Sequence, residues 1–295
     1  MKNEPIFRGV ATALVTPLNR DGVDYETFGR LIDWHIGEGI NALVIAGTTG
    51  EGSTLTDEEH REVLRYAVER AAGRVPMIAG TGSNDTAYAI DLNNYANEIG
   101  YDAGLLVTPY YNKATQNGLI RMYTEIADAS TKPIILYNVP SRTGVNIEPA
   151  TYLALADHPM IAGIKEANGN ISKIVETAAL VGDRLALYSG NDDQIFPILA
   201  LGGSGVISVL SNIAPKKTVE ICDRFFAGDI AGSRELQFEM LQLANDLFIE
   251  VNPIPVKAAV AAMGFGENYL RLPLTPMEEV HWKRLEASMR AQGLL

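Results

Sequence analysis

Two lysines of this 295-residue chain lie in apolar surroundings, where a lysine side chain could act as a reactive amine. Lys165 ends the run IAGIK (161–165) and is followed directly by Glu166, whereas Lys257 lies in the segment NPIPVK (252–257). Burial disfavours the charged ammonium and lowers the pKa of a lysine, so the neutral amine becomes available to attack a carbonyl group. The alternative for Lys165 is a strand-terminal lysine that is paired with a carboxylate.

Hydroxyl and charged side chains follow most of the other apolar runs. In chain order they are Thr48, Thr49, Tyr110, Tyr111, Tyr137, Arg142 and the segment Ser189-Gly190-Asn191-Asp192. The four histidines are scattered, with no H-x-H or H-E-x-x-H pair, so no metal site is predicted. The sequence also contains no G-x-S-x-G elbow and no P-loop, so it does not predict a serine nucleophile or a nucleotide site.

The apolar runs are continuous instead of alternating, which is typical of parallel strands covered by helices. The predicted strands are 10–15, 42–46, 75–79, 104–108, 133–138, 161–165, 185–189 and 205–209. Helical patterns separate them, at 24–38, 56–73, 86–99, 116–129, 147–157, 170–181 and 192–200, with another from about 215. Thr56 and Glu59 have the spacing of a capping box at the start of one of these helices.

Eight strands that alternate with helices predict an α/β fold, a (β/α)8 TIM barrel, over residues 1–229. Residues 230–295 are predicted to form a small C-terminal helical extension, which NPIP interrupts. A doubly wound sheet is the alternative, but it would need a glycine-rich first turn, and TPLNRDG is not one. Because chemistry in a (β/α)8 barrel gathers at the carboxyl ends of the strands, the polar side chains are expected to converge there.

The composition limits the kinds of partner. The formal net charge is -12, which argues against nucleic acid because nucleic-acid binding needs a basic surface. No apolar stretch approaches about 18 residues and the amino-terminal segment has no signal-peptide core, so no membrane span or export is expected. Cys222 is the single cysteine and is predicted to be a buried apolar side chain. The absence of an intrachain disulfide fits the cytoplasm, which is the predicted location.

Six motifs, in order over nearly the whole chain, resemble those of the pyruvate-dependent class I lyases, and within them the dihydrodipicolinate synthases. The motifs are GTTGE (47–51), TPYY (108–111), YNVPSRTG (137–144), GIKEA (163–167), SGND (189–192) and NPIPVK (252–257). The resemblance implies that Lys165 condenses with the ketone of pyruvate to give a covalent imine, with no separate cofactor. The enamine formed from this imine would then attack L-aspartate-4-semialdehyde, in lysine and diaminopimelate biosynthesis.

The resemblance also implies roles for other residues. Thr48 and Thr49 would hold the pyruvate carboxylate, and Gly190 and Ile207 would line the pyruvate pocket. Arg142 would bind the carboxylate of the semialdehyde through a two-pronged contact.

Tyr137 is implied to be the general acid and base beside the imine. Because a phenol is a poor base alone, a hydroxyl relay through Thr49 and Tyr111 would share the proton transfer. In the family Tyr111 comes from the neighbouring subunit, so the resemblance implies a homo-oligomer, usually a tetramer built as a dimer of dimers.

Three alternatives remain beside the synthase. A sugar-acid aldolase of the N-acetylneuraminate lyase branch typically has serine at Thr48 and an apolar residue at Arg142, so both residues favour the synthase, as does Glu166. A keto-acid sensor without turnover is the second alternative, and the presence of Lys165 and Tyr137 argues against it. A flavin- or phosphate-binding barrel is the third, but LSNIAPKK does not resemble a phosphate loop.

A second, degenerate site is implied for lysine as a feedback inhibitor. Asn84, His60 and Tyr110 match the lysine site of inhibited family members. Tyr88 stands where those members carry a glutamate that pairs with the lysine amine, and Asp57 stands where they often carry histidine. Loss of the glutamate removes the main charge partner of the ammonium, so inhibition by lysine is predicted to be weak or absent.

Overall fold

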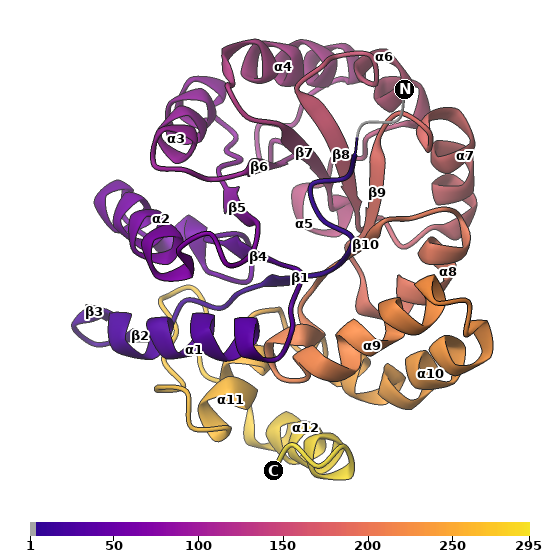
Figure 1. Cartoon of the computed structure of the whole chain (residues 1–295). Helices are drawn as coiled ribbons and strands as arrows, with labels where there is room; N and C mark the ends of the chain where they lie inside the picture. The colour runs from indigo at the N-terminus through magenta and orange to yellow at the C-terminus, as the bar shows by residue number, and fades with distance from the viewer. Residues whose placement is uncertain (1–3) are drawn as a thin grey trace.

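Eight parallel strands form a closed barrel in the computed structural model, which describes residues 4–295 (Figure 1). Around the barrel they are β1 (Gly9–Ala13), β4 (Ala42–Ile45), β5 (Met77–Gly80), β6 (Ala103–Val107), β7 (Ile134–Asn138), β8 (Ile161–Glu166), β9 (Ala186–Ser189) and β10 (Gly205–Ser208), which pairs with β1. The predicted (β/α)8 barrel is confirmed. Closure gives each of these eight strands a hydrogen-bonded neighbour on both sides, so the barrel has no exposed edge strand.

Helices surround the barrel and alternate with its strands (Figure 1). They are α1 (Tyr25–Gly37), α2 (Asp57–Ala71), α3 (Thr86–Glu98), α4 (Gln116–Ala129), α6 (Pro149–Leu155), α7 (Ile171–Val181), α8 (Ile195–Ala200) and α9 (Pro215–Phe226). The capping box predicted at the start of α2 is present: Thr56 Oγ1 accepts from the backbone N–H of Glu59, and the Glu59 carboxylate accepts from that of Thr56. This exchange satisfies two backbone donors that a helix start leaves free.

Short elements complete the barrel and correct some predicted boundaries. They are the hairpin β2 (Leu18–Asn19) and β3 (Gly22–Val23), the short helix α5 (Pro140–Thr143), and three 3-10 turns, η1 (Gly52–Thr54), η2 (Asp192–Gln194) and η3 (Leu210–Asn212). The helix predicted at 192–200 therefore begins as a 3-10 turn and is α-helical only from Ile195. The first strand ends before Val15, because the Val15 N–H donates to the side chain of Asn212 instead of to a neighbouring strand.

The interior of the barrel is filled by apolar and aromatic side chains. Phe7, which precedes β1, stacks on Tyr188 of β9 with ring centroids 4.3 Å apart, and its carbonyl accepts a hydrogen bond from the Tyr188 hydroxyl. The chain before β1 thus covers the amino ends of the strands, and the carboxyl ends are left for a site.

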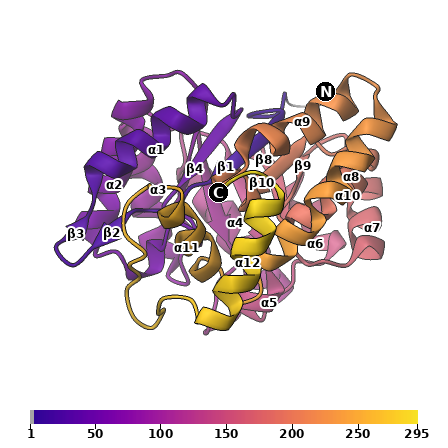
Figure 2. The ribbon, with the colours of Figure 1, turned by 90° about the horizontal axis from the view of Figure 1, so that it is seen from below.

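Three helices follow the barrel: α10 (Ile230–Asp246), α11 (Ile254–Ala262) and α12 (Glu279–Ala291). The helical extension is therefore present, while the division of the chain at residue 229 stays a prediction. α10 packs on α9, and α12 packs on both α10 and α11, as Figure 2 shows from the side of the extension.

A buried ion pair ties α11 to the barrel. Lys257 Nζ lies 2.5 Å from Glu51 Oε1 and donates to the carbonyl of Thr16 at 3.1 Å. The side chains of Lys257 and Glu51 are 3% and 1% exposed, so the charge of each is stabilised mainly by the other and not by water. Glu51 ends the GTTGE segment after β4, so this pair joins the extension to a loop at the carboxyl ends of the strands.

Replacing Lys257 is expected to destabilise the fold strongly, because it leaves the carboxylate of Glu51 buried without a counter-charge. Lys257→Met should lower the free energy of unfolding by about 3–5 kcal/mol in urea denaturation. Lys283→Met is the control, because the Lys283–Glu279 pair is 70% and 80% exposed. Its expected cost is less than about 1 kcal/mol. Equal effects of the two substitutions would contradict this account of the Lys257 pair.

Candidate active site

Lys165 lies near the carboxyl end of β8 with its side chain inside the barrel, beside Tyr137 of β7 and Tyr188 of β9 in strand register. It is 5% exposed, and its amine makes no hydrogen bond or ion pair with any residue that the structure describes. Burial lowers the pKa of Lys165 to about 7, the nearby carboxylate of Asp192 opposes this shift, and the guanidinium of Arg142 adds to it. A large share of the amine is therefore neutral at neutral pH.

The two candidate lysines differ in their partners. The ammonium of Lys257 is held by Glu51 and by a backbone carbonyl, whereas Lys165 has no such partner among the described residues. An ion-paired ammonium is a poor nucleophile, because its proton is stabilised by the partner charge. The structure thus distinguishes a structural lysine from a free amine, a choice that the apolar surroundings alone left open.

Tyr137 is the residue beside the amine. The Lys165 Nζ lies 4.2 Å from the centroid of the Tyr137 ring, which is a favourable place for a cation. Burial raises the pKa of Tyr137, while Arg142 and a hydrogen bond with the Thr48 hydroxyl lower it in part. The phenol is therefore protonated at neutral pH and can give its proton to a group bound at Lys165.

The two threonines of the GTTGE segment have different partners. Thr48 is close enough to hydrogen-bond the Tyr137 hydroxyl, whereas Thr49 is buried and its Oγ1 accepts from Asn252 Nδ2 at 2.9 Å. The sequence-based expectation that Thr49 joins a relay with Tyr137 is not matched within this chain. The adjacent threonine, Thr48, lines the cavity together with Tyr137.

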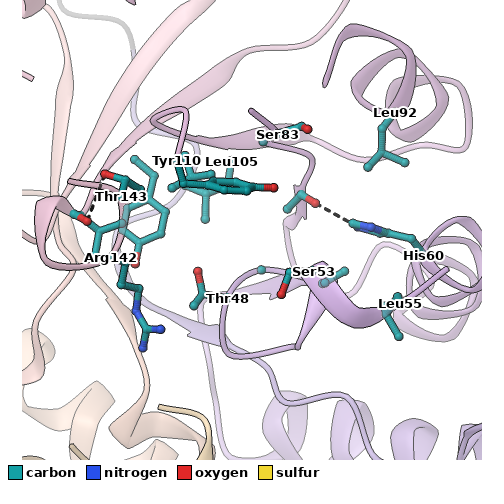
Figure 3. A pocket seen from close by; sticks show the side chains of 18 of the residues that line it. Thr48, Ser53, Leu55, His60, Ser83, Leu92, Leu105, Tyr110, Arg142 and Thr143 are labelled. Carbon is teal, nitrogen blue, oxygen red and sulfur yellow. Dashed lines mark hydrogen bonds between the residues drawn. The ribbon is translucent and has the colours of Figure 1, made fainter. Parts of the chain in front are cut away.

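Arg142 lies on α5 at the edge of the same region. Its Nη2 donates to the backbone carbonyl of Asn252 at 2.9 Å. Arg142, Thr48 and Tyr137 line one cavity of about 410 Å³. Figure 3 shows the side chains of Arg142 and Thr48 at the same end of this cavity. The cavity thus offers hydroxyl and guanidinium donors, and its wall residue Tyr137 lies against the buried amine of Lys165, a set that suits a carboxylate-bearing carbonyl compound.

Of the predicted wall residues, Gly190 directly follows β9 and is half-buried, whereas Ile207 lies within β10. The Gly190 N–H donates to the carbonyl of Glu166 at 2.7 Å, and a Cβ at this position would lie 2.6 Å from the Cβ of Ala167. Only glycine therefore fits there without a shift. Ile207 is fully buried in β10.

Tyr111 does not reach the site of its own chain. It is 92% exposed, has a φ of +67°, and makes no side-chain hydrogen bond with a described residue. A left-handed φ is strained for a tyrosine, and such strain is often found at functional positions. Tyr110, its neighbour, instead lines the 410 Å³ cavity.

The residues predicted for a lysine effector lie around the far end of that cavity. His60, Tyr88 and Tyr110 line it, and Figure 3 shows His60 at the end opposite Arg142. The Tyr88 hydroxyl donates to Asp57 Oδ1 at 2.9 Å, and His60 Nε2 lies 3.1 Å from the carbonyl of Gly80.

Asn84 is half-buried nearby, and its carbonyl accepts a hydrogen bond from Asn112. The carboxylate of Asp57 also pairs with Arg61 at 2.9 Å. The carbonyl of Asn84 and the carboxylate of Asp57 are therefore already bonded to side chains of this chain.

Three buried polar residues near the site, Asp192, Asn252 and Glu166, have contacts that the sequence did not predict. Asp192 Oδ2 accepts from the backbone N–H groups of Val209 and Leu210, and burial raises the pKa of its carboxyl. Asn252 contacts both Thr49 and Arg142 from more than 100 residues away in the chain. The motifs SGND and NPIPVK contained these two residues, but nothing local to the motifs indicated their contacts.

Glu166 is the third, and it lies on the opposite face of β8 from Lys165. Its carboxylate accepts from Asn138 Nδ2 at 3.0 Å, from the Tyr152 hydroxyl at 3.0 Å and from the Asn168 N–H at 2.9 Å. Burial raises the pKa of Glu166 to about 7, although these donors oppose the shift. Glu166 therefore does not pair with Lys165, which removes the paired-lysine alternative.

Residues 4–295 contain no group of three or more histidine, cysteine or acidic side chains that could hold a metal ion. Within the same residues, no helix combines the length and the apolar character needed to cross a membrane.

A closed (β/α)8 barrel with a free buried amine at a strand end defines a barrel enzyme of the amine-nucleophile class. The sequence profile of the Dihydrodipicolinate synthetase family matches residues 6–292, and the chain belongs to this family. A 4-hydroxy-tetrahydrodipicolinate synthase of Clostridium perfringens is 52% identical over 290 residues, which cover 98% of this chain and 100% of that protein.

Solved structures agree with this assignment. Dihydrodipicolinate synthase from Thermotoga maritima superposes with a TM-score of 0.96 at 44% identity, covering 98% of this chain and 100% of that one. The enzyme from Acinetobacter baumannii, solved with pyruvate, gives 0.95 at 44% identity, covering 98% and 99%. The predicted family, fold and activity, a 4-hydroxy-tetrahydrodipicolinate synthase acting as a lyase in lysine and diaminopimelate biosynthesis, are thereby confirmed.

The lowered pKa of Lys165 gives a pH dependence that can be measured directly. With formaldehyde and cyanoborohydride, the rate of reductive methylation at Lys165 should rise about tenfold per pH unit below 7, because only the neutral amine reacts, and should level off above about 7. Peptide mass spectrometry of samples quenched at intervals gives the rate. A rise that continues toward 10.5, the ordinary lysine value, would contradict the account of a desolvated amine.

Proposed function

We propose that the chain condenses pyruvate with L-aspartate-4-semialdehyde through a Schiff base on Lys165. The observation that carries this proposal is the buried amine of Lys165, free of any partner among the described residues and 4.2 Å from the centre of the Tyr137 ring. Two further facts support it: relatives that share about half of the sequence are named for this synthase, and the structure of the Acinetobacter baumannii relative was solved with pyruvate.

The chemistry follows from a neutral amine in a dry site. Lys165 Nζ attacks the keto carbon of pyruvate, and the resulting carbinolamine loses water to give a protonated imine. The positive imine draws electrons from the methyl carbon, which loses a proton and becomes an enamine. The enamine carbon then forms a bond to the aldehyde carbon of the semialdehyde. The aldehyde oxygen takes up a proton and becomes a hydroxyl. The amino group of the semialdehyde then attacks the iminium carbon bound to Lys165, which closes the ring and expels Lys165 as the free amine, so no separate cofactor is needed.

The protein has to move protons and orient two carboxylates. Tyr137 would give a proton to the carbinolamine hydroxyl as water leaves, and Thr48 would connect its phenol to Tyr111 of a neighbouring subunit. Thr48 replaces Thr49 in this relay because Thr48 lines the cavity together with Tyr137, whereas the Thr49 hydroxyl oxygen is bonded to Asn252. Thr49 would bind the carboxylate of pyruvate beside Gly190 and Ile207, and Arg142 would bind that of the semialdehyde.

The exposed Tyr111 supports an assembly in which two copies complete each other's sites. A tyrosine that is 92% exposed in a strained left-handed conformation suits a side chain inserted into a partner. We therefore propose a homo-oligomer with at least two subunits, and a tetramer built from two dimers. A cytoplasmic location, where pyruvate is available, and the absence of nucleic-acid and membrane partners remain predictions.

Trapping the imine is the decisive test. Incubation with pyruvate and borohydride should add the mass of a reduced pyruvate adduct to the peptide that contains Lys165. Lys165→Met should abolish the adduct and reduce turnover by at least about 1000-fold, because no other group supplies the nucleophile. An adduct on Lys257, or none at all, would refute the mechanism.

Arg142 should decide which aldehyde is accepted. Arg142→Leu removes a two-pronged contact with the carboxylate of the semialdehyde and should lower kcat/KM for that substrate by about 10- to 150-fold. The pyruvate adduct on Lys165 should still form. Condensation with a sugar aldehyde that exceeds the rate with the semialdehyde in the unmodified protein would favour the sugar-acid aldolase instead.

Lysine is expected to inhibit weakly or not at all. Tyr88 supplies a phenol where a carboxylate would pair with the lysine amine, and the Tyr88 hydroxyl is already bonded to Asp57. Initial rates at rising lysine concentration measure this. Strong inhibition at low lysine concentration would show that other groups hold the ammonium.

A further inference from the structure

We propose that Asn252, the first residue of the NPIPVK segment, positions the carboxylate anchors of both substrates. This inference rests on the proposed function, in which Thr49 binds the carboxylate of pyruvate and Arg142 binds that of the semialdehyde. It gives the C-terminal extension a part in the reaction, which the packing of its helices does not require.

The contacts of Asn252 are specific to these two groups. Its side-chain Nδ2 donates to Thr49 Oγ1 at 2.9 Å, and its backbone carbonyl accepts from Arg142 Nη2 at 2.9 Å. Asn252 is 4% exposed, so water does not compete for either bond. One residue thus lies between a threonine that follows β4 and an arginine that follows β7.

The direction of the bond to Thr49 matters for pyruvate. An amide N–H can only donate, so Asn252 occupies a lone pair of the Thr49 oxygen and leaves the hydroxyl proton free. That proton can then be given to an anion in the pocket, such as the carboxylate of pyruvate. An acceptor at the same place would take the Thr49 proton and turn it away from the substrate.

The bond to Arg142 restricts a long side chain. A guanidinium carries five N–H donors in a rigid plane, and fixing one of them on a backbone carbonyl orients the others. The remaining donors can meet a carboxylate with less loss of rotamer freedom. The carbonyl of Asn252 therefore orients Arg142 whatever side chain residue 252 carries.

Two observations show how Asn252 is held. Its Oδ1 is buried and has no hydrogen-bond partner among the described residues, so the side-chain amide is oriented by its Nδ2 contact with Thr49. Five residues further along, Lys257 pairs with Glu51, so the same segment holds the GTTGE loop at a second point. The loop and the segment therefore form one rigid unit around Thr49.

Two variants of Asn252 test whether its side chain positions Thr49 or only fills space. Asn252→Ala removes the donor and should raise the KM for pyruvate about tenfold, with kcat changed by less than about threefold. Asn252→Asp has nearly the same shape but accepts from Thr49 and adds a negative charge between the anchors. Its KM for pyruvate should rise by about 100-fold or more. Asn268→Asp, an exposed change of equal charge in the same extension, is the control and should behave as the unmodified protein.

The order of the two variants decides the question. If Asn252 merely fills space, the aspartate variant will be milder than the alanine variant, which would overturn the proposal, as would normal kinetics in both. Equal defects would also overturn it, because the donor direction would then not matter. Thermal midpoints check that each variant is folded.

A double variant covers the case in which the aspartate variant does not fold. If Asn252 acts through Thr49, then Asn252→Ala combined with Thr49→Val should raise the KM for pyruvate no more than Thr49→Val alone. Additive effects would overturn the proposal. Absence of a pyruvate adduct in the unmodified protein would instead refute the proposed function, so the two failures are distinguishable.

Discussion

The desolvation of one amine is the constraint on which the site depends. Lys165 is placed inside a closed barrel, where its ammonium is poorly solvated and its pKa falls to about 7. The effect survives because no carboxylate of residues 4–295 pairs with the amine. Asp192, whose carboxylate opposes the shift, has its Oδ2 bound by two backbone N–H groups of the segment after β10. Burial also lowers the pKa of Lys257, but a carboxylate partner, Glu51, opposes the shift and holds the ammonium in a structural ion pair.

The alternation of side chains along β8 explains why a glutamate can follow that lysine. Successive residues of a strand point to opposite faces, so Lys165 faces the barrel interior and Glu166 faces the helices. There the carboxylate of Glu166 is satisfied by Asn138, Tyr152 and a backbone N–H. The bond from Asn138 joins β7 to β8 one residue beyond the Tyr137–Lys165 pair, and so helps to fix the spacing of the phenol and the amine.

The site is assembled from parts of the chain with different tasks. The barrel supplies the dry interior, the loops after β4 and β7 supply donors for carboxylates, and the extension holds those loops through Asn252 and Lys257. Tyr111 is the one proposed catalytic group that its own chain does not bring to Lys165. A site that depends on so many distant contacts needs a rigid scaffold, which the closed parallel sheet provides.

The sequence by itself determined the local and periodic features. Continuous apolar runs predicted eight strands, the spacing of Thr56 and Glu59 predicted a helix start, and motif order indicated the family and the lysine at its centre. These features depend on neighbours within a few residues, which a pattern records. Only the tertiary structure decided which lysine lacks a partner among the described residues, that Thr48 lines a cavity with Tyr137, and that Asn252 bonds Thr49 from 203 residues away. Such pairings arise from chain closure in space, and no local pattern encodes which distant polar group will face a given hydroxyl.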